Sequence, residues 1–181
     1  MPSSLRDPLL FNAAPNFGGT WYEICSVNGS GNWSFTTATL SNGTTYSFNA
    51  KATDAAGNTS VPTTLAVTID TMPPAPPVAD VAAASDTGAS NTDNITSDST
   101  PTMTGSGTPG DTITVTFATG EVRTTVVASD GSWSVTPTQA LPDGAQNVTV
   151  TATDPAGNTS APTTVSLTID TVAPAAPVAD V

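Results

Sequence analysis

Nearly all the side chains in this sequence that could do chemistry are carboxylates. The 181 residues include 15 Asp and Glu, three Lys and Arg, and no His. The lack of His removes the commonest general base and the commonest ligand of transition metals. All the acidic residues except Glu23 and Glu121 are Asp, whose short carboxylate suits both turns and the oxygen-ligand sites of hard cations such as calcium. The sequence therefore predicts cation binding, and the protein is not expected to be an enzyme.

The charge and cysteine content narrow the partners further. A net charge of -12 repels phosphate backbones, so nucleic-acid binding is not expected. No apolar stretch approaches the length of a membrane span or of a signal peptide, so membrane insertion is not expected and an export signal is expected elsewhere. Cys25 is the only cysteine, and we expect it to be a small apolar residue in a strand.

An internal repeat organises the carboxylates. Residues 52–71 read ATDAAGNTSVPTTLAVTIDT, and residues 152–171 read ATDPAGNTSAPTTVSLTIDT. Asp70 therefore corresponds to Asp170, which gives a period of 170 − 70 = 100 residues, the size of one sandwich domain. The match extends outward in both directions, because GNWSF and PPAPPVADV in the first copy correspond to GSWSV and APAAPVADV in the second.

The repeat sets the expected domain boundaries. Residues 1–71 are expected to form an incomplete first copy, 72–171 a complete copy, and 172–181 a linker and the start of a further repeat in a longer parent chain. Residues 1–18 match nothing in the second copy. The sequence does not distinguish between a divergent first strand, a disordered start and a truncation for these residues.

The elements that must position the carboxylates are short strands between turn residues. Alternating Val, Ile and Thr predict seven antiparallel strands in the complete copy, at 78–84, 100–105, 112–117, 122–128, 133–136, 147–153 and 163–169. This pattern is typical of an all-β, immunoglobulin-like (Ig-like) sandwich. Trp33 and Trp133 occupy equivalent positions, so each is expected to anchor the core of its copy.

The sequence resembles the bacterial Ig-like repeats of large secreted surface adhesins and biofilm-associated proteins. The segments that carry the resemblance are ATDPAGNTSAPTTVSLTIDT, APAAPVADV and, at residues 86–111, DTGASNTDNITSDSTPTMTGSGTPGD. The resemblance implies a repeated stalk module at the bacterial cell surface that serves cell adhesion or biofilm formation and is often stiffened by calcium. Its implied partners are neighbouring repeats of the same polypeptide and a surface ligand of the parent adhesin that the sequence does not identify.

A first cation site is predicted where the two copies meet. Successive loops of an Ig-like sandwich alternate between its poles, which places Asp111 and the last hairpin turn at the pole where the chain enters the second copy. The first copy ends its last strand at Asp70, and the linker 71–77 contains four Pro residues, which favour a stiff, extended chain. Asp70, Asp111 and Asp154 are therefore expected to bind calcium together, with Asn158 and backbone carbonyls completing the shell.

A second cation site is predicted at the opposite pole, from Asp86, Asp93, Asp98 and Asp170, with Asn94 nearby. The loop that begins at Asp86 lacks the acidic alternation and the closing Glu of an EF-hand. For every one of these residues the alternative is ordinary turn formation, because Asp and Asn side chains bond to their own backbone. Asp130, Asp143 and Asp180 are expected at solvated turns or strand ends.

The sequence offers two alternatives to the stalk, an enzyme and a binding module. A pair of carboxylates could serve a glycosidase, but the predicted pairs recur at domain ends with the repeat and no single-copy cleft is evident. A ligand- or carbohydrate-binding Ig-like module would show one copy with unusual aromatic loops. Only the first 30 residues offer these, through Phe11, Phe17, Trp21 and Tyr22.

Overall fold

The computed structural model of the protein describes residues 9–14, 22–23, 34, 36–53 and 56–178. The predictions for Cys25, Trp33 and Asp180 fall outside these residues. The chain divides into two compact units, Met1–Thr71 and Met72–Val181. All the regular elements of the described residues are strands, and none of these residues belongs to a helix that could cross a membrane.

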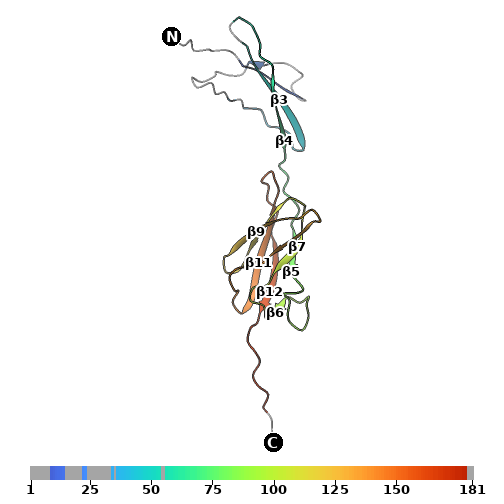
Figure 1. Cartoon of the computed structure of the whole chain (residues 1–181), viewed down its shortest axis with the longest axis vertical. Coiled ribbons are helices and arrows are strands. Elements are labelled where there is room, and N and C mark those ends of the chain that lie inside the picture. The colour runs from blue at the N-terminus through green and yellow to red at the C-terminus, as the bar shows by residue number, and fades with distance from the viewer. Residues whose placement is uncertain (1–8, 15–21, 24–33, 35, 54–55, 179–181) are drawn as a thin grey trace, which may run out of the picture. The chain divides into compact units, whose positions relative to one another are not determined.

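The second unit is a sandwich of two sheets (Figure 1). One sheet has the order β10-β7-β5 and the other the order β6-β12-β11-β8-β9. All neighbours pair antiparallel except β6, which runs parallel to β12. The strands are β5 (Val78–Val81), β6 (Ile95–Thr96), β7 (Met103–Ser106), β8 (Thr112–Thr116), β9 (Val122–Val126), β10 (Ser132–Val135), β11 (Gly144–Thr153) and β12 (Thr163–Ile169).

The prediction of an all-β, Ig-like fold is confirmed, and the sequence missed one strand. The two residues of β6 are too few to show an alternating pattern, and β6 is recognisable only by its pairing with the end of β12. The first predicted strand was too long, because β5 ends at Val81 and the chain turns at Ala82, whose carbonyl accepts a hydrogen bond from the Ser85 N–H at 2.7 Å.

The core of the second unit lies between its two sheets. Along β11 the side chains alternate, and Val148, Val150 and Ala152 point inward with no more than 1% of their surface exposed. Trp133 of β10 is 4% exposed and belongs to the same hydrophobic cluster, so its predicted place in the core is confirmed. Burial of such side chains is the main force that holds two sheets together.

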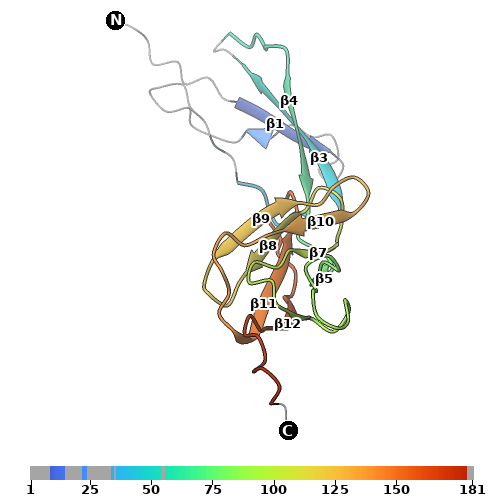
Figure 2. The ribbon, with the colours of Figure 1, turned by 60° about the horizontal axis from the view of Figure 1, so that its bottom comes forward.

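The described residues of the first unit form a single antiparallel sheet of order β2-β1-β3-β4, which Figure 2 shows from a second direction. The strands are β1 (Leu9–Ala14), β2 (Tyr22–Glu23), β3 (Thr44–Ala52) and β4 (Thr63–Ile69). The β3–β4 hairpin has the register of β11–β12, since Ala50 pairs with Thr63 as Val150 pairs with Thr163. Beside β3, β1 occupies the place that β8 holds beside β11. Part of the segment 1–18 is therefore a strand.

Candidate functional site

One end of the second unit, which we call the proximal pole, gathers two of the predicted ligands. β8 begins just after Asp111, and β11 ends just before Asp154. The start of the unit lies at the same end, because the Thr163 hydroxyl donates a 2.7 Å hydrogen bond to the carbonyl of Pro77. Asp111 and Asp154 are close enough that the charge of Asp154 raises the pKa of Asp111.

Asp154 organises its own turn. Its Oδ1 accepts hydrogen bonds of 2.9 Å from the N–H groups of both Ala156 and Asn158. Its Oδ2 accepts a third, also of 2.9 Å, from Nδ2 of Asn158. These bonds lower the pKa of Asp154, with the Asn158 side chain as the largest cause. Turn formation therefore accounts for the positions of both predicted ligands, although oxygens that accept hydrogen bonds can also bind a cation.

Asp111 is different, because turn formation leaves part of its carboxylate unpaired. The residue is 3% exposed, and its Oδ2 has no hydrogen-bond partner. Burial is the main cause that raises the pKa of Asp111, the charge of Asp154 adds to it, and a hydrogen bond from the Thr108 side chain opposes both. A buried, unpaired carboxylate oxygen beside a second carboxylate is costly in the absence of a cation. The unpaired oxygen of Asp111 is therefore the feature of the proximal pole whose charge a cation would neutralise.

The proximal pole does not supply a complete ligand set. Among the described residues, no three Asp, Glu, Cys or His side chains gather closely enough to hold a metal ion. Asp70 belongs to the first unit, so its predicted approach to Asp111 and Asp154 stays a prediction.

The loop that contains Asp86 lies at the opposite end, the distal pole. The Asp170 N–H donates to the Thr96 carbonyl at 2.9 Å, and the Thr168 N–H donates to the Asn94 carbonyl at 2.8 Å. These bonds bring the loop to the end of β12. Asp86 is 3% exposed, and its Oδ2 accepts a 3.1 Å bond from the Asn94 N–H, whereas its Oδ1 is buried without a partner. Asp86 is thus the distal counterpart of Asp111.

The other three distal carboxylates cap turns. In each, one carboxylate oxygen accepts a hydrogen bond from the N–H two residues further along the chain. The bonds are Asp93 to Ile95 at 3.2 Å, Asp98 to Thr100 at 2.8 Å and Asp170 to Val172 at 3.0 Å. For these residues the observed contacts favour the turn interpretation.

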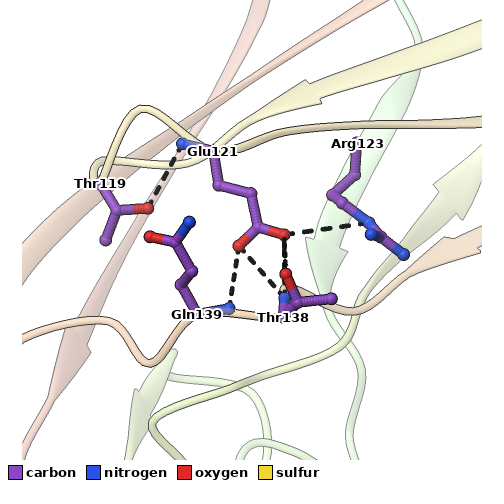
Figure 3. Close-up of polar contacts among 5 residues, drawn as sticks. All are labelled: Thr119, Glu121, Arg123, Thr138 and Gln139. Carbon is purple, nitrogen blue, oxygen red and sulfur yellow. Dashed lines mark hydrogen bonds and ion pairs between the residues drawn. The ribbon is translucent and has the colours of Figure 1, made fainter.

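Sequence reasoning overlooked Glu121, whose carboxylate ties the β8–β9 hairpin to the segment after β10 (Figure 3). Its Oε1 accepts hydrogen bonds from the Thr138 hydroxyl at 2.6 Å and the Thr138 N–H at 2.9 Å, and its Oε2 accepts one from the Gln139 N–H at 3.0 Å. Arg123 lies 4.0 Å away. The Thr138 hydroxyl is the largest cause that lowers the pKa of Glu121. Its one signal in the sequence is that it is the only Glu of the second copy.

Asp143 also has more than the solvated role expected of it. Its carboxylate accepts bonds from the Thr171 N–H at 3.1 Å and the Thr171 hydroxyl at 2.9 Å. This contact joins the start of β11 to the residues after β12. Asp130, by contrast, caps a turn as expected, through bonds from the N–H and hydroxyl of Ser132.

Two of the solved structures that match this chain come from adhesins. A tetra-tandem repeat from the extending region of a large adhesion protein is 23% identical over 93% of this chain and 43% of that structure, with a TM-score of 0.42. A Ca²⁺-stabilized adhesin that helps an Antarctic bacterium bind ice is 29% identical over 92% of this chain and 40% of that structure, with a TM-score of 0.41. The chain thus spans less than half of either structure.

The FN1–FN3 domains of chicken CNTN1 are 16% identical, cover 91% of this chain and 56% of that structure, and give a TM-score of 0.51, which shows a shared fold alone. No curated protein sequence matches the chain. The bacterial Ig-like domain family matches twice, over residues 11–71 and 73–171. The two matches together include most of the sequence and coincide with its two copies, and the chain therefore belongs to the bacterial Ig-like domain family.

Proposed function

We propose that this chain is a structural stalk segment of a bacterial cell-surface adhesin, serving cell adhesion or biofilm formation outside the cell. The observation that carries the proposal is the repetition of one Ig-like domain at a period of 100 residues with a short, Pro-rich connection. Such an arrangement suits a spacer, because each copy adds length and presents similar loops. The proposed role is not enzymatic.

We further propose that calcium stabilises the stalk. The orphaned oxygens of Asp111 and Asp86 support this, since each is a buried carboxylate oxygen without a hydrogen-bond donor. At the proximal pole Asp111 and Asp154 would hold the ion, with Asn158 and the sequence-predicted Asp70. At the distal pole Asp86 would hold it, with Asp93, Asp98 and Asp170 at the same end. Calcium would supply a positive charge that removes the repulsion between carboxylates and restricts the movement of the loops.

The test is a thermal melt combined with small-angle X-ray scattering, in excess calcium and then in excess chelator. If the proposal holds, calcium raises the melting temperature and narrows the distribution of particle dimensions. In Asp111→Asn this response is reduced or lost. Asp130→Asn is the matched control, because it removes the same charge from an exposed turn and should leave the calcium response intact.

Failure of the calcium proposal would look different from failure of the stalk proposal. If neither melting temperature nor scattering responds to calcium, the aspartates act as turn formers only and the stalk proposal survives. If the full chain binds a cell-surface glycan or protein directly, and Trp21→Ala or Tyr22→Ala abolishes that binding, the chain is a binding module.

A further inference from the structure

One short motif recurs along this chain and has no part in the stalk role. It is the sequon Asn-x-Ser/Thr, in which the Asn nitrogen can accept a sugar and the hydroxyl two residues later is needed for the transfer. Seven of the eleven Asn residues begin a sequon, whereas Ser and Thr at 53 of 181 positions would give about three by chance. The seven are Asn28, Asn32, Asn42, Asn58, Asn94, Asn147 and Asn158. The last five lie in the described residues, so their accessibility in the folded chain can be compared.

In three of these five sequons the fold holds the hydroxyl. The three begin at Asn58, Asn94 and Asn158. Ser160 is 7% exposed, and its hydroxyl bonds to two backbone groups. Ser60 makes the same two bonds in the first copy, and Thr96, which is 1% exposed, donates to a backbone carbonyl. An enzyme could use these hydroxyls only if the fold opened locally.

The sequon of Asn147 is held by its backbone. It lies inside β11, where Asn147 pairs with Ser166 of β12 and Thr149 pairs with residues of both β12 and β8. A strand between two paired neighbours cannot bend into the active site of an enzyme without losing hydrogen bonds. Asn147 is therefore also a poor acceptor in the folded chain.

Asn42 differs from the other four. Asn42 and Gly43 form an exposed turn just before β3. The Oδ1 of Asn42 accepts a 2.7 Å hydrogen bond from the Thr71 N–H, and among the described residues nothing accepts a bond from its Nδ2. The Thr44 hydroxyl is exposed, and its one contact is a 3.5 Å bond to the Asn42 carbonyl. Both groups that a sugar transfer uses are therefore accessible without unfolding.

The second copy shows that the fold does not need the nitrogen of Asn42. Asp143 occupies the equivalent place, and its carboxylate accepts the Thr171 N–H at 3.1 Å as Asn42 accepts the Thr71 N–H. The two residues after Asp143 are Gly and Ala, so the second copy has no sequon there. An oxygen is sufficient for the structural contact, which leaves the nitrogen of Asn42 available for another role.

We propose that Asn42 is an acceptor for N-linked glycosylation in the folded chain. The donor is a sugar whose anomeric carbon is bound to a phosphate, as in nucleotide-linked and lipid-linked sugars. Nδ2 forms a bond to that carbon while the bond from the carbon to the phosphate oxygen breaks. The phosphate leaves with the electron pair, and Nδ2 loses one proton to a base of the transferase. The sugar would shield the start of the Pro-rich linker, because the Thr71 N–H bonds to the same side chain. This goes beyond the stalk role.

The first test supplies both kinds of donor to the folded full chain. One reaction contains a soluble asparagine glycosyltransferase with a nucleotide-linked hexose, and the other contains membranes with an oligosaccharyltransferase and its lipid-linked oligosaccharide. Unfolded peptides that carry the Asn42 and Asn158 sequons confirm that each enzyme is active. Mass spectrometry with peptide fragmentation locates the sugar.

We expect a sugar at Asn42 and none at Asn58, Asn94, Asn147 or Asn158. A single hexose at Asn42 supports the proposal with a nucleotide-linked source, and an oligosaccharide supports it with a lipid-linked source. If neither donor modifies Asn42 in the folded chain, or if Asn158 is occupied as fully as Asn42, the proposal is overturned.

The second test separates the modification from the structural contact. Asn42→Asp removes the nitrogen and keeps the oxygen that accepts the Thr71 N–H, so it should keep the melting temperature of the unmodified chain and lose the sugar. Thr44→Ala removes the hydroxyl of the sequon and should also lose the sugar. Thr45→Ala is the matched control, because it removes a neighbouring exposed hydroxyl outside the sequon, and it should be modified like wild type. Equal modification of Thr44→Ala and Thr45→Ala would contradict the proposal.

Discussion

The two copies share a hairpin but bury it to different extents. β4 and β12 pair in the same register with β3 and β11, yet Leu65 is 62% exposed whereas its equivalent, Val165, is 6% exposed. β12 contacts β5 of a second sheet, and the described residues of the first unit form one sheet only. The comparison teaches that the repeated sequence is sufficient for the hairpin, whereas burial needs a second layer.

The same comparison shows one local task performed by two side chains. Tyr46 and Gln146 are equivalent residues near the starts of β3 and β11, and both are buried. The Tyr46 hydroxyl accepts a 2.9 Å bond from the Ser41 N–H, and Nε2 of Gln146 donates a 2.8 Å bond to the Pro142 carbonyl. In each copy the side chain links its long strand to the segment that precedes the strand. The link is kept although the hydroxyl of Tyr46 accepts its hydrogen bond and the amide of Gln146 donates one.

The largest expected effect is the loss of stability when a buried Leu of the second copy is replaced by Ala, compared with an exposed Leu of the first copy. Leu167→Ala should destabilise the second domain by about 2–5 kcal/mol, because the side chain is 3% exposed and its loss leaves a cavity. The same change at an exposed Leu of the equivalent strand in the first domain, Leu65→Ala, should cost less than about 1 kcal/mol. Hydrogen exchange measured by mass spectrometry reports on each domain in the intact chain. Equal losses of protection would break the comparison.

A smaller effect is expected at a hydroxyl that both copies use in the same way. Ser60 and Ser160 accept hydrogen bonds of 3.0 Å from the N–H groups of Ala52 and Ala152. Ser160 is 7% exposed and Ser60 is exposed. Ser160→Ala should lower the stability of the second domain by about 1–3 kcal/mol, because it leaves the buried Ala152 N–H without this acceptor. Ser60→Ala should lower the stability of the first domain by less. Hydrogen-exchange rates of the Ala52 and Ala152 amides, measured by NMR, test this order. A larger increase in exchange at Ala52 than at Ala152 would contradict it.

Tyr46 offers a milder test of the first copy. Tyr46→Phe keeps the ring, which is fully buried beside Phe48, and removes only the oxygen that accepts the Ser41 N–H. The expected loss is about 0.5–1.5 kcal/mol, read from urea unfolding of the first domain. If Tyr46→Phe unfolds that domain entirely, the first copy is less stable than its hairpin contacts imply.

The smallest expected effect is a change in pH dependence. Glu121, Asp130 and Asp154 of the second domain have lowered pKa values, so the stability they contribute is present above their unfolded pKa values and is lost as pH falls through their folded ones. Asp111 has a raised pKa, so its protonation favours the folded state as pH falls and offsets part of that loss. Asp111→Asn should therefore melt higher than wild type at neutral pH in chelator, and should lose stability more steeply toward acid. Parallel melts from neutral to acidic pH measure both, and an unchanged slope would contradict the burial of this charge.

The poles at which the candidate ligands lie could be predicted from the order of the strands. The sequence placed Asp111 and Asp154 at one pole and Asp86 at the other, since loop order in a sandwich follows from strand order. It could not distinguish Asp86 and Asp111 from Asp93, Asp98 and Asp170. That difference depends on burial and on which donors reach each oxygen, and neither property is local in the sequence.

The sequence by itself determined the all-β fold, the 100-residue repeat and the hairpins, because alternation and turn residues act over a few positions. Only the tertiary structure decided that β6 pairs with β12 and that Glu121 binds Thr138 and Gln139. These features join residues far apart in the chain. Their energies depend on the packing of the two sheets, which brings those residues together and excludes water from between them.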